Sequence, residues 1–263
     1  MIGFIGLGSM GSGMASNLLK YVQQTDALLV YNRTEAKAAN LIQQGARFAT
    51  LQEMATHCNI VFSMLFDDEA LKTTFDSIAS CKINISDSHL GFNQLLVACR
   101  DLIYVDCSTV YPETTKQLTA KAETMGIQYV ACTVFGRPDA ARNKSLVAAL
   151  AGNPAATETV RPYITSMTRT ILDVGIEPYL ANVQKLTGNF LIAGVIELLA
   201  EAQALAEKNG LSRQQYSNFV CQCFPAPIIT GYSNRIASQS FEIKENEGFP
   251  VRGGIKDVSS IKK

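Results

Sequence analysis

A glycine-rich turn close to the start of the chain constrains the fold more than any other feature. Met1–Ile5 is a short apolar run of strand length, and Gly6-Leu7-Gly8-Ser9-Met10-Gly11 follows it directly. A helical pattern, Met10–Tyr21, continues from the turn. A strand that passes through such a turn into a helix is the arrangement that seats a dinucleotide pyrophosphate against backbone N–H groups. An ordinary tight turn is the alternative, so the rest of the chain must decide.

The first two thirds of the chain alternate strand-like and helix-like segments. The predicted strands are Met1–Ile5, Ala27–Tyr31, Ile60–Met64, Leu102–Asp106, Ile127–Val134, Leu146–Leu150 and Thr170–Val174. The predicted helices among them are Met10–Tyr21, Glu35–Gln43, Asp68–Ser77 and Pro112–Thr124. Such alternation predicts a parallel sheet with helices on both faces, and it favours the dinucleotide interpretation of the turn. Residues 80–91 show no clear period and are expected to form a surface insertion.

The last third of the chain is helical in pattern. Tyr179–Asn209 contains no proline and is apolar on almost every turn, which predicts one long helix covered by another domain or subunit. Gly210 is expected to end it. Two shorter helices are predicted to follow, Ser212–Cys223 and Ala226–Ser238. We therefore predict a Rossmann-type, doubly wound α/β domain over residues 1–176 and an all-α domain over residues 177–263.

Composition argues against several classes of partner. Lys plus Arg and Asp plus Glu both number 23, so no net positive field attracts nucleic acid or an anionic membrane. No uninterrupted apolar run approaches the roughly 20 residues of a membrane span, and no signal peptide opens the chain, so we expect a cytoplasmic protein. Seven scattered cysteines and two histidines offer neither a disulfide framework nor a metal site.

The residues after the second predicted strand indicate which dinucleotide is bound. An NAD site needs a carboxylate there for the ribose 2′-hydroxyl, but this chain reads Asn32-Arg33-Thr34. Arg33 brings a cation suited to a 2′-phosphate, and Asn32 and Thr34 can form hydrogen bonds beside it. We therefore expect NADP rather than NAD; a solvated loop charge is the alternative role for Arg33.

Further motifs follow in an order that matches a known family. They are Met14-Ala15-Ser16-Asn17-Leu18, Ser63-Met64-Leu65-Phe66, Asp106-Cys107-Ser108-Thr109, Val134-Phe135-Gly136, Lys185-x-x-x-Asn189 and Lys256-Asp257. Together with the glycine turn they resemble the β-hydroxyacid dehydrogenase family, which includes 3-hydroxyisobutyrate dehydrogenase, glyoxylate/succinic semialdehyde reductases and 6-phosphogluconate dehydrogenase. The resemblance spans nearly the whole chain. It implies hydride transfer between a nicotinamide and a small 3-hydroxyacid or oxoacid.

The resemblance also implies roles for individual residues. Lys185 would be the catalytic acid/base, with Asn189 as its partner, and both would contact the substrate. Ser108 would join them in the catalytic set and, with Gly136, bind the substrate. The implied cofactor contacts are Gly6, Leu7, Gly8, Ser9, Met10, Gly11, Asn32, Arg33, Thr34, Met64, Leu65, Phe66, Thr109 and Lys256.

The spacing of Lys185 and Asn189 has chemical meaning without the resemblance. Residues four apart lie on one helix face, a turn from each other. Burial in an apolar helix would lower the pKa of a lysine, and such a group can exchange a proton with a substrate oxygen while hydride moves at carbon. The alternative is that Lys185 extends to solvent. Ser108 and Thr109 have an alternative too, because they can cap the helix that starts at Pro112.

Three features depart from the family pattern. The run Thr133-Val134-Phe135-Gly136-Arg137 has Phe135 in place of a serine that the resemblance implies for holding a substrate carboxylate; Arg137 is a candidate substitute. Ala70 stands where asparagine is usual, and the chain stops at Lys263, a helix earlier than its relatives.

These departures leave three functions open: an NADP(H)-dependent reductase of oxoacids, an imine reductase, and a catalytically silent NADP-binding module. Retention of Lys185 and Asn189 favours the first. The long apolar helix predicts a homodimer, with a monomer as the alternative.

Overall fold

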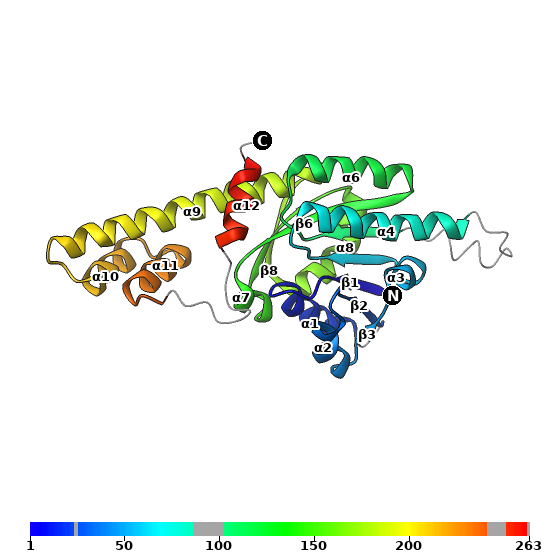
Figure 1. Cartoon of the computed structure of the whole chain (residues 1–263), viewed down its shortest axis with the longest axis horizontal. Helices are drawn as coiled ribbons and strands as arrows, with labels where there is room; N and C mark the ends of the chain where they lie inside the picture. Colours follow the sequence, from blue (N-terminus) through cyan, green and yellow to red (C-terminus); the bar gives the residue numbers. More distant parts are fainter. Residues whose placement is uncertain (24–25, 87–101, 241–250, 262–263) are drawn as a thin grey trace. The chain divides into compact units, whose positions relative to one another are not determined.

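The computed structural model describes residues 1–23, 26–86, 102–240 and 251–261 (Figure 1). The chain divides into two compact units, residues 1–185 and residues 186–263. The first contains the whole sheet, and the second is helical. This confirms the predicted fold class, a doubly wound α/β domain followed by an all-α region.

One eight-stranded sheet forms the centre of the first unit, in the order β3-β2-β1-β4-β5-β6-β7-β8. The strands are β1 (Ile2–Ile5), β2 (Leu28–Tyr31), β3 (Arg47–Phe48), β4 (Ile60–Ser63), β5 (Leu102–Asp106), β6 (Ile127–Phe135), β7 (Leu146–Ala151) and β8 (Thr168–Gly175). All neighbours are parallel except β6 and β7. That reversal departs from the predicted all-parallel sheet, because residues 136–145 are too few for a crossover connection.

Helices cover both faces of the sheet (Figure 1). They are α1 (Gly11–Val22), η1 (Glu35–Ala38), α2 (Ala39–Gln43), α3 (Leu51–His57), α4 (Asp68–Ser86), α6 (Pro112–Thr124), α7 (Pro138–Arg142) and α8 (Pro154–Met167). Successive strand residues point to opposite faces, so Phe4 packs in the core under α1 and α8, and Ile5 in the core under α3, α4 and α6. Helix α4 runs to Ser86, which corrects the expectation of an irregular insertion over residues 80–86; residues 87–91 lie outside the described chain.

The first turns of α9 (Tyr179–Lys208) belong to the sheet unit. The Thr133 hydroxyl of β6 donates a hydrogen bond to the Ala181 carbonyl at 2.8 Å. The Asn182 amide oxygen accepts from the Val110 N–H at 3.1 Å, and its nitrogen donates to the Thr115 hydroxyl at 2.8 Å. These buried bonds attach the start of α9 to the sheet unit, and the two compact units meet after Lys185, inside α9. The predicted domain boundary at residues 176/177 stays a prediction.

The second unit consists of the remainder of α9 with α10 (Arg213–Cys223), α11 (Pro227–Ala237) and α12 (Val251–Ile261). Gly210 adopts φ +87° and ends α9 as expected. Ser212 and Gln215 cap the start of α10 reciprocally. Helix α12 forms at the place where the sequence showed only a helix start.

Much of α9 presents large apolar side chains to solvent within this chain. The exposed members are Val183, Phe190, Leu191, Leu198 and Leu205. By length and composition α9 is also long and apolar enough to cross a membrane, with mean hydropathy 1.4 in its most apolar window. A long apolar helix that is buried in a soluble protein has the same character. Within the described residues, these apolar side chains of α9 are left uncovered.

Candidate functional site

The glycine turn is closely packed on one side and open on the other. Gly6 adopts φ +91°, and a Cβ there would overlap with the Met64 carbonyl oxygen. A Cβ on Gly11 would overlap with the carbonyl oxygen of Gly6. A Cβ on Gly8, in contrast, would meet no described atom within 4 Å. The turn thus presents open space in front of the N-terminus of α1, where backbone N–H groups attract an anion.

Asn32 holds this turn in place. Its amide oxygen accepts a hydrogen bond from the Leu7 N–H at 2.9 Å, and its amide nitrogen donates to the Thr34 carbonyl at 2.9 Å. Arg33 and Thr34, which follow at the carboxyl end of β2, are exposed. The space at Gly8, the helix start and the exposed guanidinium fit the phosphates of a dinucleotide. Asn32 therefore acts on the shape of the site through the turn.

A second set of contacts joins the loops after β4 and β5. The Leu65 N–H donates to the Ser108 hydroxyl oxygen at 2.9 Å. The Asp106 Oδ1 atom accepts from the Ser108 N–H and from the Ser63 hydroxyl, each at 3.0 Å. Ser63, Asp106 and Ser108 are fully buried. Ser108 thus fixes the loop that contains Leu65 and Phe66, a contribution that sequence reasoning did not foresee.

Asp106 is the residue of this set whose chemistry the sequence left unassigned. Burial raises the pKa of its carboxyl group from 3.8 to about 6, with the hydrogen bonds from Ser108 and Ser63 acting in the opposite direction. The signal was present as an acidic residue at the end of an apolar strand. Its partner Ser63 is distant in sequence, so only the sheet register reveals the contact.

Lys185 lies on the same unit as the turn and is buried, with 8% of its surface exposed. Its Nζ atom is 4.5 Å from the centroid of the Phe135 ring, a cation–π distance. Phe135 is the last residue of β6, so it lies at the carboxyl edge of the parallel strands, the edge that carries the glycine turn and Ser108. The alternative in which Lys185 extends to solvent does not hold within this chain.

Two neighbours of Phe135 belong to the turn into α7. Gly136 adopts φ +138° and is exposed, and a Cβ there would come within 2.6 Å of the Leu146 side chain. Arg137 is half-buried and immediately precedes α7. Thr109, whose implied role is at the cofactor, is half-buried at the end of β5. These three residues follow the carboxyl ends of β6 and β5, the edge at which open α/β sheets bind ligands.

Two predicted residues, Asn189 and Lys256, lie in the second unit. The Asn189 amide nitrogen donates to the Asp257 carboxylate at 2.7 Å, and the Lys256 Nζ atom forms an ion pair with the other oxygen of that carboxylate at 3.0 Å. Asp257 is buried, with 2% exposed. Asp257 therefore orients both residues, a role that the Lys-Asp motif alone did not indicate. Along α9, Asn189 follows Lys185 by one turn.

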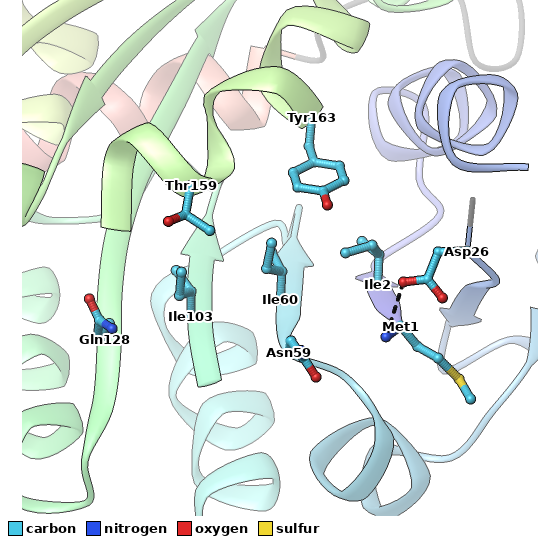
Figure 2. A pocket seen from close by; sticks show the side chains of 9 residues that line it. All are labelled: Met1, Ile2, Asp26, Asn59, Ile60, Ile103, Gln128, Thr159 and Tyr163. Carbon is cyan, nitrogen blue, oxygen red and sulfur yellow. Dashed lines mark ion pairs between the residues drawn. The ribbon is translucent and has the colours of Figure 1, made fainter. Parts of the chain in front are cut away.

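A separate hollow of ≈ 380 Å³ lies at the opposite edge of the sheet (Figure 2). Its lining includes Ile2, Asn59, Ile103 and Gln128, from the amino ends of β1, β4, β5 and β6. The N-terminal ammonium and Asp26 form an ion pair there at 3.1 Å. Open α/β sheets bind ligands at the carboxyl ends of their strands, so this hollow is not the candidate site.

Residues 1–175 match the family model for the NAD binding domain of 6-phosphogluconate dehydrogenase. The chain belongs to this family. An uncharacterized oxidoreductase of Bacillus subtilis, YfjR, is 33% identical over 98% of this chain and 84% of its own length. An NADH-dependent oxidoreductase of Aspergillus ustus is 30% identical over 87% of this chain and 73% of its own length. The predicted membership in the dehydrogenase family is confirmed, and the protein is an NAD(P)-binding oxidoreductase by family.

Solved structures agree on the fold. The 3-hydroxyisobutyrate dehydrogenase of Mycobacterium tuberculosis superposes with a TM-score of 0.79 at 22% identity, over 99% of this chain and 84% of that protein. Psf3, solved in complex with NADP+ and 2-OPP, superposes with a TM-score of 0.78 at 25% identity, over 100% of this chain and 86% of that protein. The sheet followed by a helical region is therefore the arrangement of this family.

Proposed function

We propose that the protein is an NADP(H)-dependent oxidoreductase that interconverts a small hydroxyacid or related alcohol and its carbonyl form, with Lys185 as general acid/base. The observation that carries this proposal is the buried Lys185 ammonium at the sheet edge that also holds the open glycine turn. Buried ionisable side chains cluster at functional sites, and ligands of open α/β sheets bind at this edge.

In the proposed reaction, Lys185, Asn189 and Ser108 each have a separate role. A bound nicotinamide supplies or accepts the hydride. Lys185 donates a proton to the carbonyl oxygen during reduction and accepts the hydroxyl proton during oxidation. Asn189, oriented by Asp257, is proposed to hold the same oxygen by a hydrogen bond. Ser108 fixes the loop at Leu65 through its hydroxyl, and its implied contact with the substrate stays a prediction.

The preference for NADP is part of the proposal. It is supported by the exposed Arg33 and by the absence of a carboxylate at the end of β2. Two of the similar proteins differ in their cofactor: Psf3 was solved with NADP+, whereas the Aspergillus ustus protein is NADH-dependent. We expect Arg33→Ala to lower the kcat/KM ratio of NADPH to NADH by about tenfold or more. Lys37 is also exposed, so Lys37→Ala is the control. An unchanged NADPH-to-NADH ratio in Arg33→Ala would contradict the proposed role of Arg33.

The decisive experiment measures NADPH consumption with glyoxylate, succinic semialdehyde, neutral aldehydes and cyclic imines. We expect reduction of a carbonyl substrate, and a fall in kcat of at least about 100-fold in Lys185→Ala. Lys144→Ala, an exposed lysine in the same unit, should retain full activity. Exclusive turnover of imines would identify an imine reductase. NADPH binding without any turnover would identify a silent binding module and contradict the proposal.

The proposal also includes an assembly and a location. The exposed apolar side chains of α9 support a homodimer in which α9 is covered by a second copy. A cytoplasmic location follows only from the sequence and is proposed on that basis.

A further inference from the structure

Two contacts between a lysine and an aromatic ring occur within the part of the chain that the structure describes, and they differ in their surroundings. Lys116 lies 4.7 Å from the Tyr179 ring centroid, but its side chain is 49% exposed and pairs with Glu113 at 3.4 Å. Lys185 lies 4.5 Å from the Phe135 ring centroid and is buried. Water screens the first contact, whereas the second acts on a desolvated ammonium and is therefore the stronger one.

The Phe135 ring changes the electrostatic character of the space around Lys185. The face of an aromatic ring carries partial negative charge, so it attracts the ammonium and repels a carboxylate. The ring also occupies volume on one side of the Nζ atom. A carboxylate beside Lys185 is attracted by the ammonium, but it also loses its water and meets the ring face, whereas an apolar group packs against the ring without either cost.

The backbone holds Phe135 at this place. Phe135 pairs with Val147 of β7, and the Thr133 hydroxyl two residues earlier binds the Ala181 carbonyl of α9. The strand that carries the ring and the helix that carries Lys185 are thus joined by a buried hydrogen bond at 2.8 Å. The ring and the ammonium are fixed parts of one unit.

We infer that Phe135 determines substrate specificity: it selects carbonyl compounds that place an uncharged, apolar group beside Lys185, and it disfavours those with a carboxylate next to the reacting carbon. This inference rests on the proposed function. In the reduction, the carbonyl carbon receives hydride from the reduced nicotinamide, and the oxygen receives the Lys185 proton. The products are the alcohol and the oxidised nicotinamide, and water reprotonates the lysine.

The activity test compares glyoxylate, which has a carboxylate on the carbonyl carbon, with butanal, which has none. We expect the wild type to prefer butanal in kcat/KM, and Phe135→Ala to lower the butanal-to-glyoxylate ratio by about tenfold. Phe135→Leu keeps most of the side-chain volume but has no π face, so its butanal-to-glyoxylate ratio should lie between those of the wild type and Phe135→Ala. Tyr179→Leu removes the exposed ring contact and should leave the ratio unchanged. An unchanged ratio in an active Phe135→Ala enzyme would overturn the inference.

A second readout needs no turnover and separates this inference from the proposed function. An amine-reactive reagent labels lysines in the apoprotein, and peptide mass spectrometry follows Lys185 with and without added acetate or acetamide. In Phe135→Ala and Phe135→Leu we expect acetate, but not acetamide, to slow the labelling of Lys185 at least about twofold; in the wild type neither should. Equal protection by acetate in wild type and variants would refute the role of the ring, even if no tested carbonyl is reduced.

Discussion

The two units of this protein both contain buried polar sets, but they differ in how many large apolar side chains they leave exposed on one helix. In the sheet unit, polar side chains at the functional edge bind one another, as in the buried Ser63, Asp106 and Ser108 set. In the helical unit, a buried set around Asp257 exists as well, but large apolar side chains such as Leu191 and Leu198 are exposed. The sheet unit therefore contains the contacts that shape its edge, whereas apolar side chains of α9 stay exposed among the described residues.

This difference indicates which residues should affect the candidate site and which should affect assembly. Residues that shape the carboxyl edge of the sheet are held by hydrogen bonds inside the first unit, and their substitution should act on folding or binding within one chain. Residues on α9 should act on association between chains. Three substitutions test this contrast.

The largest effect is expected at the glycine turn. A methyl group on Gly11 would overlap with the Gly6 carbonyl oxygen, so Gly11→Ala should destabilise the sheet unit by about 3 kcal/mol and abolish cofactor binding. Gly8→Ala is the matched control: it meets no described atom, so it should unfold like the wild type while binding NADPH at least about tenfold more weakly. Urea unfolding and calorimetric titration measure both quantities. Equal stability of Gly11→Ala and Gly8→Ala would contradict the packing argument.

An intermediate effect is expected at Asp106. Its pKa is about 6 in the folded protein and near 3.8 when unfolded, so the folded state binds the proton more tightly. The carboxyl group therefore contributes stability below pH 4, and this contribution of about 2 to 3 kcal/mol is lost as the pH rises through 6. Asp106→Asn cannot ionise and keeps an oxygen acceptor for Ser63 and Ser108. Its unfolding free energy relative to wild type should rise between pH 4 and pH 7; a flat difference would show that burial does not govern this group.

The smallest effect is expected on α9. Leu198→Glu places a charge on the exposed apolar surface of the helix and should weaken self-association by at least about tenfold without lowering the melting temperature of the sheet unit. Glu197→Gln, one residue earlier and also exposed, is the control. Sedimentation velocity over a concentration series measures the change. A wild type that stays monomeric at all concentrations would show that a second copy does not cover α9.

Local patterns predicted the parts of the fold that carry strong local signals. Three strands, β1, β4 and β5, are short apolar runs with clear boundaries. The glycine turn is a recognisable motif, and α9 is a long segment without proline. Helix α8 was missed because Pro162 lies inside it, where proline normally ends a helix. Its buried Val160 and Ile164 show that packing on the sheet maintains the helix. Strand β3 has only two residues, too few to show a period.

For the candidate site, the sequence indicated individual residues but not the contacts between them. Lys185 and Phe135 were both singled out, yet their contact joins a strand end to a helix fifty residues later and depends on the fold. Asp257 and Ser63 gained their roles only through partners distant in the chain. Asn32 was expected to face the cofactor, and the structure shows it binding the turn. The spacing of residues in the sequence predicts which of them are neighbours along one helix or strand. Contacts between different elements can be predicted only when the order of the strands in the sheet is known.

The hydrogen bonds of Thr133 and Asn182 have a consequence for synthesis of the chain. They place the first turns of α9, up to Lys185, in the sheet unit. Domains fold as units and the N-terminal one first during translation, so the sheet unit can close around Lys185 before the residues of α10 to α12 leave the ribosome. Lys185, the residue proposed to transfer the proton, can then be in place before Lys256 emerges, so the order of translation sets the order in which the proposed reactive groups are positioned.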